Sequence, residues 1–203
     1  MSSRDQILSR VRAALAPLPR RAPLPEWDRE LVRVRQAQTA ADPWIPFAAR
    51  LRSVSGTPLT AVSDLVALLA RSGWRRGYCD PVAWPALAPA FPRDFQVETA
   101  FDRTRVDDYQ FGITVAAGAI AETGTLVLSD QVTSARLAAL APWVHVALLR
   151  REQIFPDITA AVTALPDDPN IIWCTGPSKT ADVEGILIEG VHGPGVQVAL
   201  LVG

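Results

Sequence analysis

The chain has 203 residues, 49% of them hydrophobic and 20% charged, and its formal net charge at pH 7 is −1. This composition excludes a mostly disordered chain, and the balanced charge argues against a broad surface for binding nucleic acid. The length fits one domain with a small appendage. The two cysteines, Cys79 and Cys174, are too few for a disulfide-rich scaffold or for a four-thiolate iron–sulfur cluster.

Targeting and metal-binding motifs are weak. No segment has the roughly 18 consecutive apolar residues of a membrane-spanning helix, and the N-terminus lacks the apolar block of a secretory signal. The arginine-rich start is faintly similar to a transit peptide, but the proline-dense segment behind it is typical of a linker. The two histidines, His145 and His192, are far apart in the sequence. We therefore expect a cytoplasmic protein without a metal site.

Residues 1–42 predict a helical arm. Ser2 or Ser3 can cap a helix whose apolar face runs from Ile7 to Leu15, and prolines after residue 16 end it. A second helix is predicted over 26–40. The arginine excess could bind an acidic partner or a nucleic acid, but an amphipathic helix that docks on its own domain or a neighbour is the favoured interpretation.

Residues 43–203 predict an α/β domain. The pattern indicates a helix at 44–54, a strand at 59–62, a helix capped by Ser63, a strand at 78–79, a proline-rich connection over 81–93 and a strand at 95–98. It continues with strands at 112–117 and 119–128, a helix at 134–140, a strand at 144–149, a helix at 154–165, and strands at 171–174, 185–188 and 196–202. Apolar strands that alternate with helices predict a mostly parallel sheet flanked by helices.

The first segment that could carry chemistry surrounds Glu122, the one ionisable residue between Gly118 and Leu128. Burial would raise the pKa of this carboxylate, and the backbone amides of Thr123, Gly124 and Thr125 could counter that rise. A carboxylate that faces a cavity and one that reaches water at the end of a strand fit the pattern equally well. The segment does not match the dinucleotide-binding fingerprint.

The second segment follows the apolar run 171–174. Its residues Gly176, Ser178, Lys179 and Thr180 have the composition of a turn that holds an anion at the carboxyl end of a strand. Lys179 is the single lysine of the chain. A binding role is favoured over a plain surface charge, and the segment is not a Walker loop.

Two acidic residues close the second segment. Asp182 and Glu184 could organise Lys179 or bind a polar ligand. Solvated charges beside a helix N-terminus are an equally good interpretation.

The third segment places His192 beside Gly193 in a glycine-rich turn. Such a histidine can approach a ligand and titrate near neutrality, and a loop histidine without a role fits equally well. His145 lies within an apolar strand, so we expect it to be structural. Cys174, beside Trp173, is expected to be a buried strand residue rather than a nucleophile.

Three segments, 119–125, 176–184 and 190–194, in this order and near the C-terminus, resemble the lactate utilization protein C family, the family of the LUD domain. The resemblance is strongest over about 105–203. It implies a fold similar to the sugar-phosphate isomerase and CoA-transferase superfamily (NagB/RpiA/CoA-transferase-like), here with an N-terminal helical extension. The implied domains are an arm at 1–42 and a LUD-type domain at 43–203.

The resemblance also implies a part in the oxidation of L-lactate to pyruvate. Two iron–sulfur partner proteins would carry the redox centres, and no cofactor is expected on this chain. Glu122 and His192 are the predicted catalytic residues, and a small carboxylate is the predicted ligand. The predicted ligand-binding residues are Thr123, Gly124, Thr125, Gly176, Ser178, Lys179, Thr180, Asp182, Glu184 and Gly193.

Two alternatives remain open. The chain could be a stand-alone enzyme that acts on a CoA ester or a phosphorylated small molecule, because the Glu122-Thr123-Gly124 turn is similar to the Glu-x-Gly turn of CoA transferases. It could instead be a non-catalytic adaptor that docks a partner through its arginine-rich helix. No further sequence pattern separates these two from the leading hypothesis.

Overall fold

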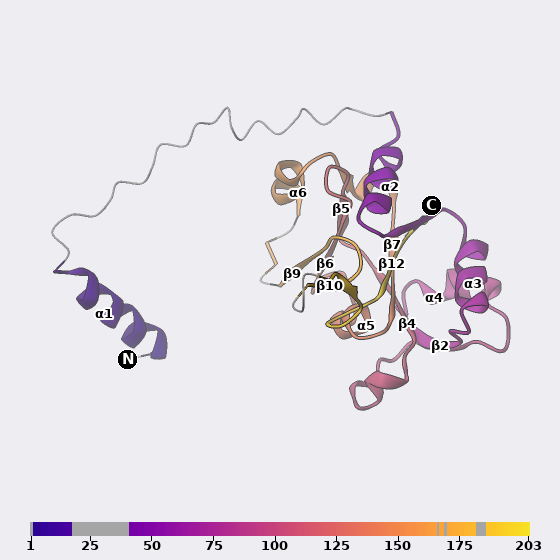
Figure 1. The fold of residues 1–203 in the computed structure, drawn as a ribbon, viewed down its shortest axis with the longest axis horizontal. Helices are drawn as coiled ribbons and strands as arrows, with labels where there is room; N and C mark the ends of the chain where they lie inside the picture. Colours follow the sequence, from indigo (N-terminus) through magenta and orange to yellow (C-terminus); the bar gives the residue numbers. More distant parts are fainter. Residues whose placement is uncertain (1, 18–40, 166, 169, 182–185) are drawn as a thin grey trace. The chain divides into compact units, whose positions relative to one another are not determined.

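A computed structural model of the chain describes residues 2–17, 41–165, 167–168, 170–181 and 186–203 (Figure 1). The contacts divide the chain into two units, Met1–Gln36 and Ala37–Gly203. The predicted helix at 26–40 lies outside the described residues. The predicted boundary at residue 42 therefore stays a prediction.

The first unit contains helix α1 (Ser3–Leu15). Ser2 caps it as predicted: the Asp5 amide donates to the Ser2 hydroxyl at 3.2 Å, and the Ser2 amide donates to the Asp5 carboxylate at 3.0 Å. These reciprocal bonds form a capping box. The Ser2 hydroxyl also donates to the Asp5 carboxylate at 2.8 Å, and this bond, together with the bond from the Ser2 amide, holds the pKa of Asp5 below its usual value. None of the residues of α1 is buried, including those on its apolar face.

The second unit is built on a six-stranded parallel sheet, which confirms the predicted α/β class with a mostly parallel sheet. Its order is β1 (Thr57–Leu59), β12 (Val196–Leu201), β7 (Val144–Leu149), β4 (Phe111–Val115), β2 (Arg76–Cys79), β3 (Gln96–Glu98). The central strands are apolar along almost their whole length because both faces of the sheet are covered.

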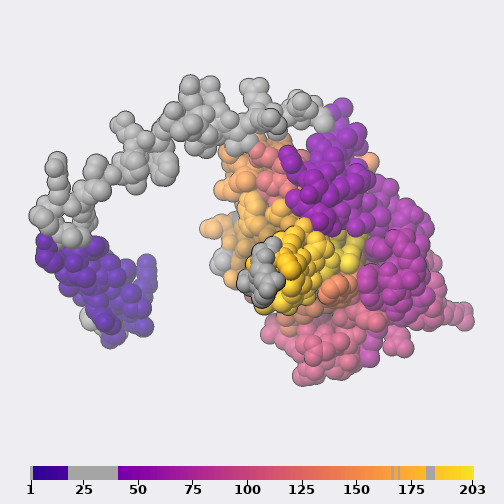
Figure 2. All heavy atoms as spheres, in the orientation of Figure 1, coloured from indigo at the N-terminus to yellow at the C-terminus, as the bar shows by residue number. Residues whose placement is uncertain are grey.

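Alternate residues of β7 and β12 enter two cores. Val146, Leu148 and Leu200 face the side covered by α3 (Val62–Arg71) and α4 (Trp84–Leu87). Leu149 and Leu201 face the other side, where they pack with α2 (Trp44–Ser53) and a second sheet. In the space-filling view the yellow C-terminal segment lies against the purple segment that contains α2 (Figure 2).

The second sheet has four strands in the order β8 (Ile154–Phe155), β5 (Gly118–Ile120), β6 (Thr125–Ser129), β9 (Ile171–Cys174). A two-stranded antiparallel hairpin, β10 (Lys179–Thr180) with β11 (Ile188–Glu189), follows it in the chain. The remaining helices are α5 (Arg136–Leu140) and α6 (Ile158–Ala164), together with short 3-10 turns at Ala88–Ala90, Arg103–Asp108 and Arg151–Gln153.

Two predicted elements were wrong. The expected strand over 119–128 is broken into antiparallel β5 and β6, because Gly124 turns the chain with φ +69°. The expected helix over 154–165 begins only at Ile158, since Ile154 pairs with Ala119 and Asp157 caps the helix. Pro156, which lies between them, cannot belong to a helix interior.

Smaller corrections concern the segment 57–93. Strand β1 ends at Leu59 rather than at Val62, and α3 begins at Val62 without a side-chain cap from Ser63. The proline-rich connection contains α4, in whose first turn a proline costs no helical hydrogen bond. Among the residues that the structure describes, no helix has the length and apolarity to span a membrane.

Candidate functional site

The Glu122 segment forms the turn between β5 and β6. The Gly124 amide donates to the Ile120 carbonyl at 2.9 Å, and the Glu122 amide donates to the Pro156 carbonyl at 3.1 Å. The Glu122 side chain is partly exposed. Partial exposure fits both interpretations left open by the sequence, so the role of Glu122 stays a prediction.

Gly124 brings this turn onto the C-terminal half of α2. A methyl group added at Gly124 would lie 2.7 Å from the Leu51 amide nitrogen, so only glycine permits the approach. Beside it, three threonine hydroxyls form a chain: Thr123 and Thr125 are 2.7 Å apart, and Thr125 and Thr175 are 2.8 Å apart. These bonds tie the turn to the residue that follows β9.

The second segment packs on the end of the same helix. Gly176 has φ +78°, and an added methyl group would collide with the Val54 carbonyl oxygen. Lys179 donates from Nζ to the Ser55 hydroxyl at 2.9 Å and to the Val54 carbonyl at 3.5 Å. Its ammonium also lies 3.3 Å from the Glu189 carboxylate, its cross-strand partner in the hairpin. Three acceptors therefore surround the lysine.

The third segment is joined to the second by backbone hydrogen bonds. The Ser178 amide donates to the Pro194 carbonyl at 2.8 Å, and the Gly190 amide donates to the Ser178 carbonyl at 2.8 Å. A methyl group added at Gly193 would lie 3.2 Å from the Ser178 Cβ. The structure thus joins the three predicted segments into one connected region, of which the first two segments pack on α2 and its end.

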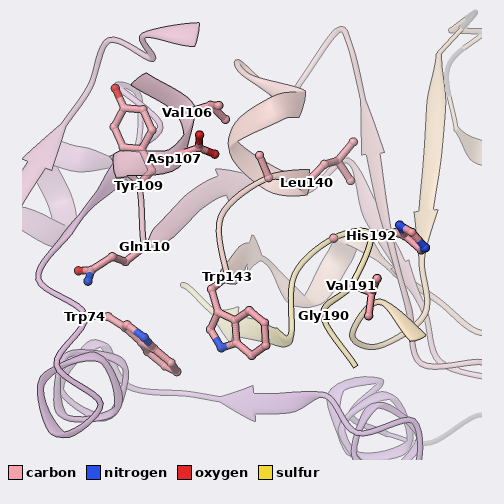
Figure 3. A pocket seen from close by; sticks show the side chains of 12 residues that line it. Trp74, Val106, Asp107, Tyr109, Gln110, Leu140, Trp143, Gly190, Val191 and His192 are labelled. Atoms are coloured by element: carbon pink, nitrogen blue, oxygen red, sulfur yellow. The ribbon is translucent and has the colours of Figure 1, made fainter. Parts of the chain in front are cut away.

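His192 lines a hollow of about 510 Å³ at the amino ends of the parallel strands. Trp74, Gln110 and Trp143 line it from just before β2, β4 and β7. In the close-up view, Trp74 and Gln110 lie on one side of the hollow and His192 on the other, with Trp143 between them (Figure 3). The side-chain oxygen Oε1 of Gln110 accepts from the Arg75 amide at 2.7 Å and from the Arg76 amide at 3.0 Å, which fixes the side chain.

The predicted residues do not all meet in this hollow. Within the described part of the chain, its lining includes Gly193 but neither Glu122 nor Lys179. Asp182 and Glu184 lie outside the described residues. Thr180 lies in β10 and is partly buried. The roles predicted for these residues remain predictions.

Sequence reasoning missed Trp74, Gln110 and Trp143. Each precedes an apolar strand, and this common position was the available signal. Amino ends of neighbouring parallel strands lie at one edge of a sheet, but the order of the strands is needed to know which residues meet there. Trp143 also packs against Gly190 and Gly195, which leave room for its ring.

His145 is structural, as predicted. It is buried in β7, with Nε2 2.9 Å from the Thr114 hydroxyl of β4 and Nδ1 beside the Gln197 amide of β12. Burial lowers its pKa to about 4, and the hydrogen bond with Gln197 opposes this shift only in part. The histidine is therefore neutral at physiological pH.

The cysteines are poor nucleophiles. Burial raises the pKa of the Cys79 thiol to about 12, helped by the neighbouring Asp80 carboxylate, and raises that of Cys174 to about 11. Among the described residues, no cluster of three or more histidine, cysteine, aspartate or glutamate side chains could hold a metal ion.

Comparison with known proteins gives concordant matches. The model of the LUD domain family matches residues 85–202, more than half of the chain. A Deinococcus radiodurans protein named Lactate utilization protein C is 30% identical over 128 residues, which cover 61% of this chain and 59% of the relative. A protein of the same name from Anoxybacillus flavithermus is 37% identical over 86 residues, or 41% of this chain and 39% of the relative.

The matched regions thus span less than two thirds of each of these relatives. A crystal structure of a DUF162 family protein from Deinococcus radiodurans matches with a TM-score of 0.55 and 22% identity, covering 79% of this chain and 96% of that chain. At that identity the match shows a shared fold and no more.

Proposed function

Because the chain belongs to the LUD domain family, we propose that it is a component of a lactate utilization system that oxidises L-lactate to pyruvate. The name shared by its relatives supports this role. Oxidation of lactate to pyruvate removes two electrons and two protons. With two cysteines in 203 residues, the chain has too few thiolates for a four-thiolate cluster. The electrons therefore pass to iron–sulfur partner proteins, while this chain binds the organic acid and handles protons.

The observation that carries this proposal is the connection of the three family-like segments, the first two of which pack on α2 and its end. Gly124 packs on the C-terminal half of α2, Gly176 packs on Val54, the residue that follows the helix, and Ser178 is bonded to the third segment. The Lys179 ammonium is the proposed counter-charge for the carboxylate of lactate or pyruvate. Glu122 and His192 are the proposed proton-handling groups.

A carboxylate ligand at Lys179 must compete with Glu189. The Lys179–Glu189 pair lies 3.3 Å apart, with 27% and 41% of the two side chains exposed, so the contact is weak enough to be exchanged. Glu189→Gln removes the competitor. It is therefore expected to strengthen pyruvate binding, whereas Lys179→Gln weakens it by about tenfold.

Gene deletion followed by complementation tests the cellular role. Loss of the gene is expected to abolish growth on L-lactate as sole carbon source, and the intact gene should restore it. Iron-containing proteins are expected to co-purify with the chain from native cells. Unchanged growth of the deletion strain on lactate would contradict the proposal.

Calorimetric titration with pyruvate tests the proposed site. Arg93→Gln, which removes an exposed cation elsewhere, is the matched control for Lys179→Gln. Equal affinities in the Lys179 and Arg93 variants would exclude the lysine site and leave the cellular role to be judged by the growth experiment.

A second candidate, a non-catalytic adaptor, is favoured by one observation on α1. Its apolar residues Ile7 and Val11 are 59% and 47% exposed, which is more than a solvated helix requires. If the chain is an adaptor, removing residues 1–40 abolishes recovery of partner proteins, and the Lys179 and His192 substitutions leave growth on lactate intact.

A further inference from the structure

The order in which the chain adds strands to the parallel sheet reverses between β2 and β4. From β2 the chain moves outward to β3 at the edge of the sheet, whereas from β4 it moves the other way, through β7 to β12. The connections that leave the carboxyl ends of β2 and β4 therefore diverge and leave a crevice between them. In open parallel sheets this is the position at which ligands bind.

A hollow of about 820 Å³ lies at this position. Tyr78 lines it from β2, and Pro81 and Thr99 line it from the segments that follow β2 and β3. Thr133 also lines it and is held there because its hydroxyl donates to the carbonyl of Val115, the last residue of β4, at 3.0 Å. The volume lies within the roughly 300–1,000 Å³ of small-molecule sites.

One wall of this switch-point hollow is aromatic and fixed. The Phe101 ring meets the Tyr78 ring edge-on, with centroids 5.5 Å apart, and stacks on Tyr109 at 4.9 Å. Leu137 and Leu140 of α5 supply further apolar surface. The body of a ligand would therefore find a rigid apolar wall.

The polar side of the hollow favours an anion. It contains two guanidinium groups, on Arg103 and Arg136, and one carboxylate, on Asp130, which lies 2.6 Å from Arg136 Nε. The cations therefore exceed the anions by one. A guanidinium presents a planar fork of donors that matches the oxygens of carboxylate and phosphate.

Two hydroxyls in the lining add a donor. The Tyr78 and Ser134 oxygens are 2.6 Å apart, so one of them donates to the other. Each hydroxyl carries one hydrogen, so this bond uses one hydrogen and leaves the second for a ligand oxygen. Burial raises the pKa of Tyr78, so the phenol keeps its hydrogen at neutral pH.

We propose that the switch-point hollow binds an organic anion, with its carboxylate or phosphate group held by Arg103 and Arg136 and its apolar body against Phe101 and Leu140. The site does not include Lys179. It lies at the carboxyl ends of the strands, whereas the His192 hollow lies at their amino ends, and the two linings share Leu140. It stands whether or not the chain acts in lactate utilization.

Calorimetric titration of the full chain tests this site with four probes: phenyl phosphate, benzoate, inorganic phosphate and phenol. At least one of phenyl phosphate and benzoate is expected to bind more tightly than inorganic phosphate, because both have a phenyl ring that can contact the aromatic wall. The comparison of phenyl phosphate with benzoate decides which oxyanion the site prefers. Phenol lacks the charge, so binding of phenol as tight as that of both anions would overturn the proposal.

Substitutions locate the binding. Arg103→Gln and Arg136→Gln are each expected to weaken binding of the preferred probe by about tenfold, while the control Arg93→Gln, which removes an exposed guanidinium outside the lining, leaves it unchanged. Thermal unfolding of each variant verifies that it is folded, and Arg103→Gln provides the test if Arg136→Gln is not. Wild-type affinity in Arg103→Gln, or an equal loss in Arg93→Gln, would overturn the assignment.

Asp130→Asn gives a test of opposite sign. It removes the carboxylate that competes for Arg136, so the affinity for the anionic probe should rise by several-fold. If Asp130 served only to hold the loop, its loss would weaken binding instead. A fall in affinity in a folded Asp130→Asn protein would therefore contradict the proposed recognition of the anion by Arg136.

Discussion

The six-stranded sheet and the region around the β10–β11 hairpin place polar side chains in opposite environments. In the large sheet, Thr114, His145 and Gln197 lie on three neighbouring strands and are buried. Around the hairpin, Lys179 and Glu189 lie at the surface and remain partly exposed. A buried polar contact can change stability strongly, whereas an exposed one contributes little. The free energy of unfolding should therefore depend mainly on the large sheet. Residues around the hairpin can be substituted, and ligand binding there altered, with little loss of stability.

The largest effect that we expect is at the centre of the large sheet. Phe111→Ala removes a fully buried ring from β4 and should lower the free energy of unfolding by about 3 to 5 kcal/mol. Trp173→Ala on the edge strand β9, where 40% of the side chain is exposed, is the matched change in the smaller sheet and should cost clearly less. Urea unfolding measures both. Equal losses would show that burial in the six-stranded sheet contributes no more to stability than partial burial in the four-stranded sheet.

The buried histidine predicts a pH dependence. The pKa of His145 is about 4 in the folded protein and 6.5 in an exposed histidine, so the unfolded chain binds the proton more tightly. The neutral form of His145 therefore contributes about 3 kcal/mol to the free energy of unfolding. This contribution is complete above about pH 6.5 and is lost as the pH falls towards 4. His145→Gln keeps a polar group without a proton to gain. Its stability should fall less between pH 7 and 4.5, and an unchanged pH profile would contradict the prediction.

Gly124 gives a smaller effect, in the turn that carries Glu122. Gly124→Ala combines a positive φ with contact against the α2 backbone and should cost about 2 to 3 kcal/mol. Gly73 has a similar φ, +76°, but open space around it, so Gly73→Ala isolates the backbone strain and should cost about 1 kcal/mol. Thermal unfolding compares them. If Gly73→Ala lowered the stability as much as Gly124→Ala, the contact of the added methyl group with α2 would make no contribution to the loss.

The smallest expected effect is at Lys179. Lys179→Gln removes a partly exposed ion pair and should change the free energy of unfolding by less than about 1 kcal/mol. Urea unfolding at low and high salt provides the measurement. A loss above 2 kcal/mol, insensitive to salt, would instead assign the lysine a structural role like that of His145.

The large sheet was predictable because its central strands are almost wholly apolar. Residues 144–149 and 196–202 match β7 and β12 closely, since parallel strands buried on both faces carry few polar residues. The break between β5 and β6 was not predicted. Apolar residues on both sides of Glu122 conceal the turn, whose geometry depends on contact between Gly124 and a distant helix.

The site was predictable only in part. The three segments were found from their residue types, and their spacing in the sequence indicated a family. The acceptors of Lys179 were not predicted, because Ser55 precedes it by 124 positions and meets it only through tertiary packing. The hollow at the β2–β4 switch point depends on strand order, which hydrophobic periodicity does not contain.

The position of β12 has a consequence for biosynthesis. This strand, Val196–Leu201, follows every other described strand in the sequence but lies second in the sheet, between β1 and β7. While a ribosome is still translating the preceding residues, β1 has no neighbour and one edge of β7 is unpaired. Such edges can pair with other nascent chains. The large sheet therefore closes only after its final strand has left the exit tunnel.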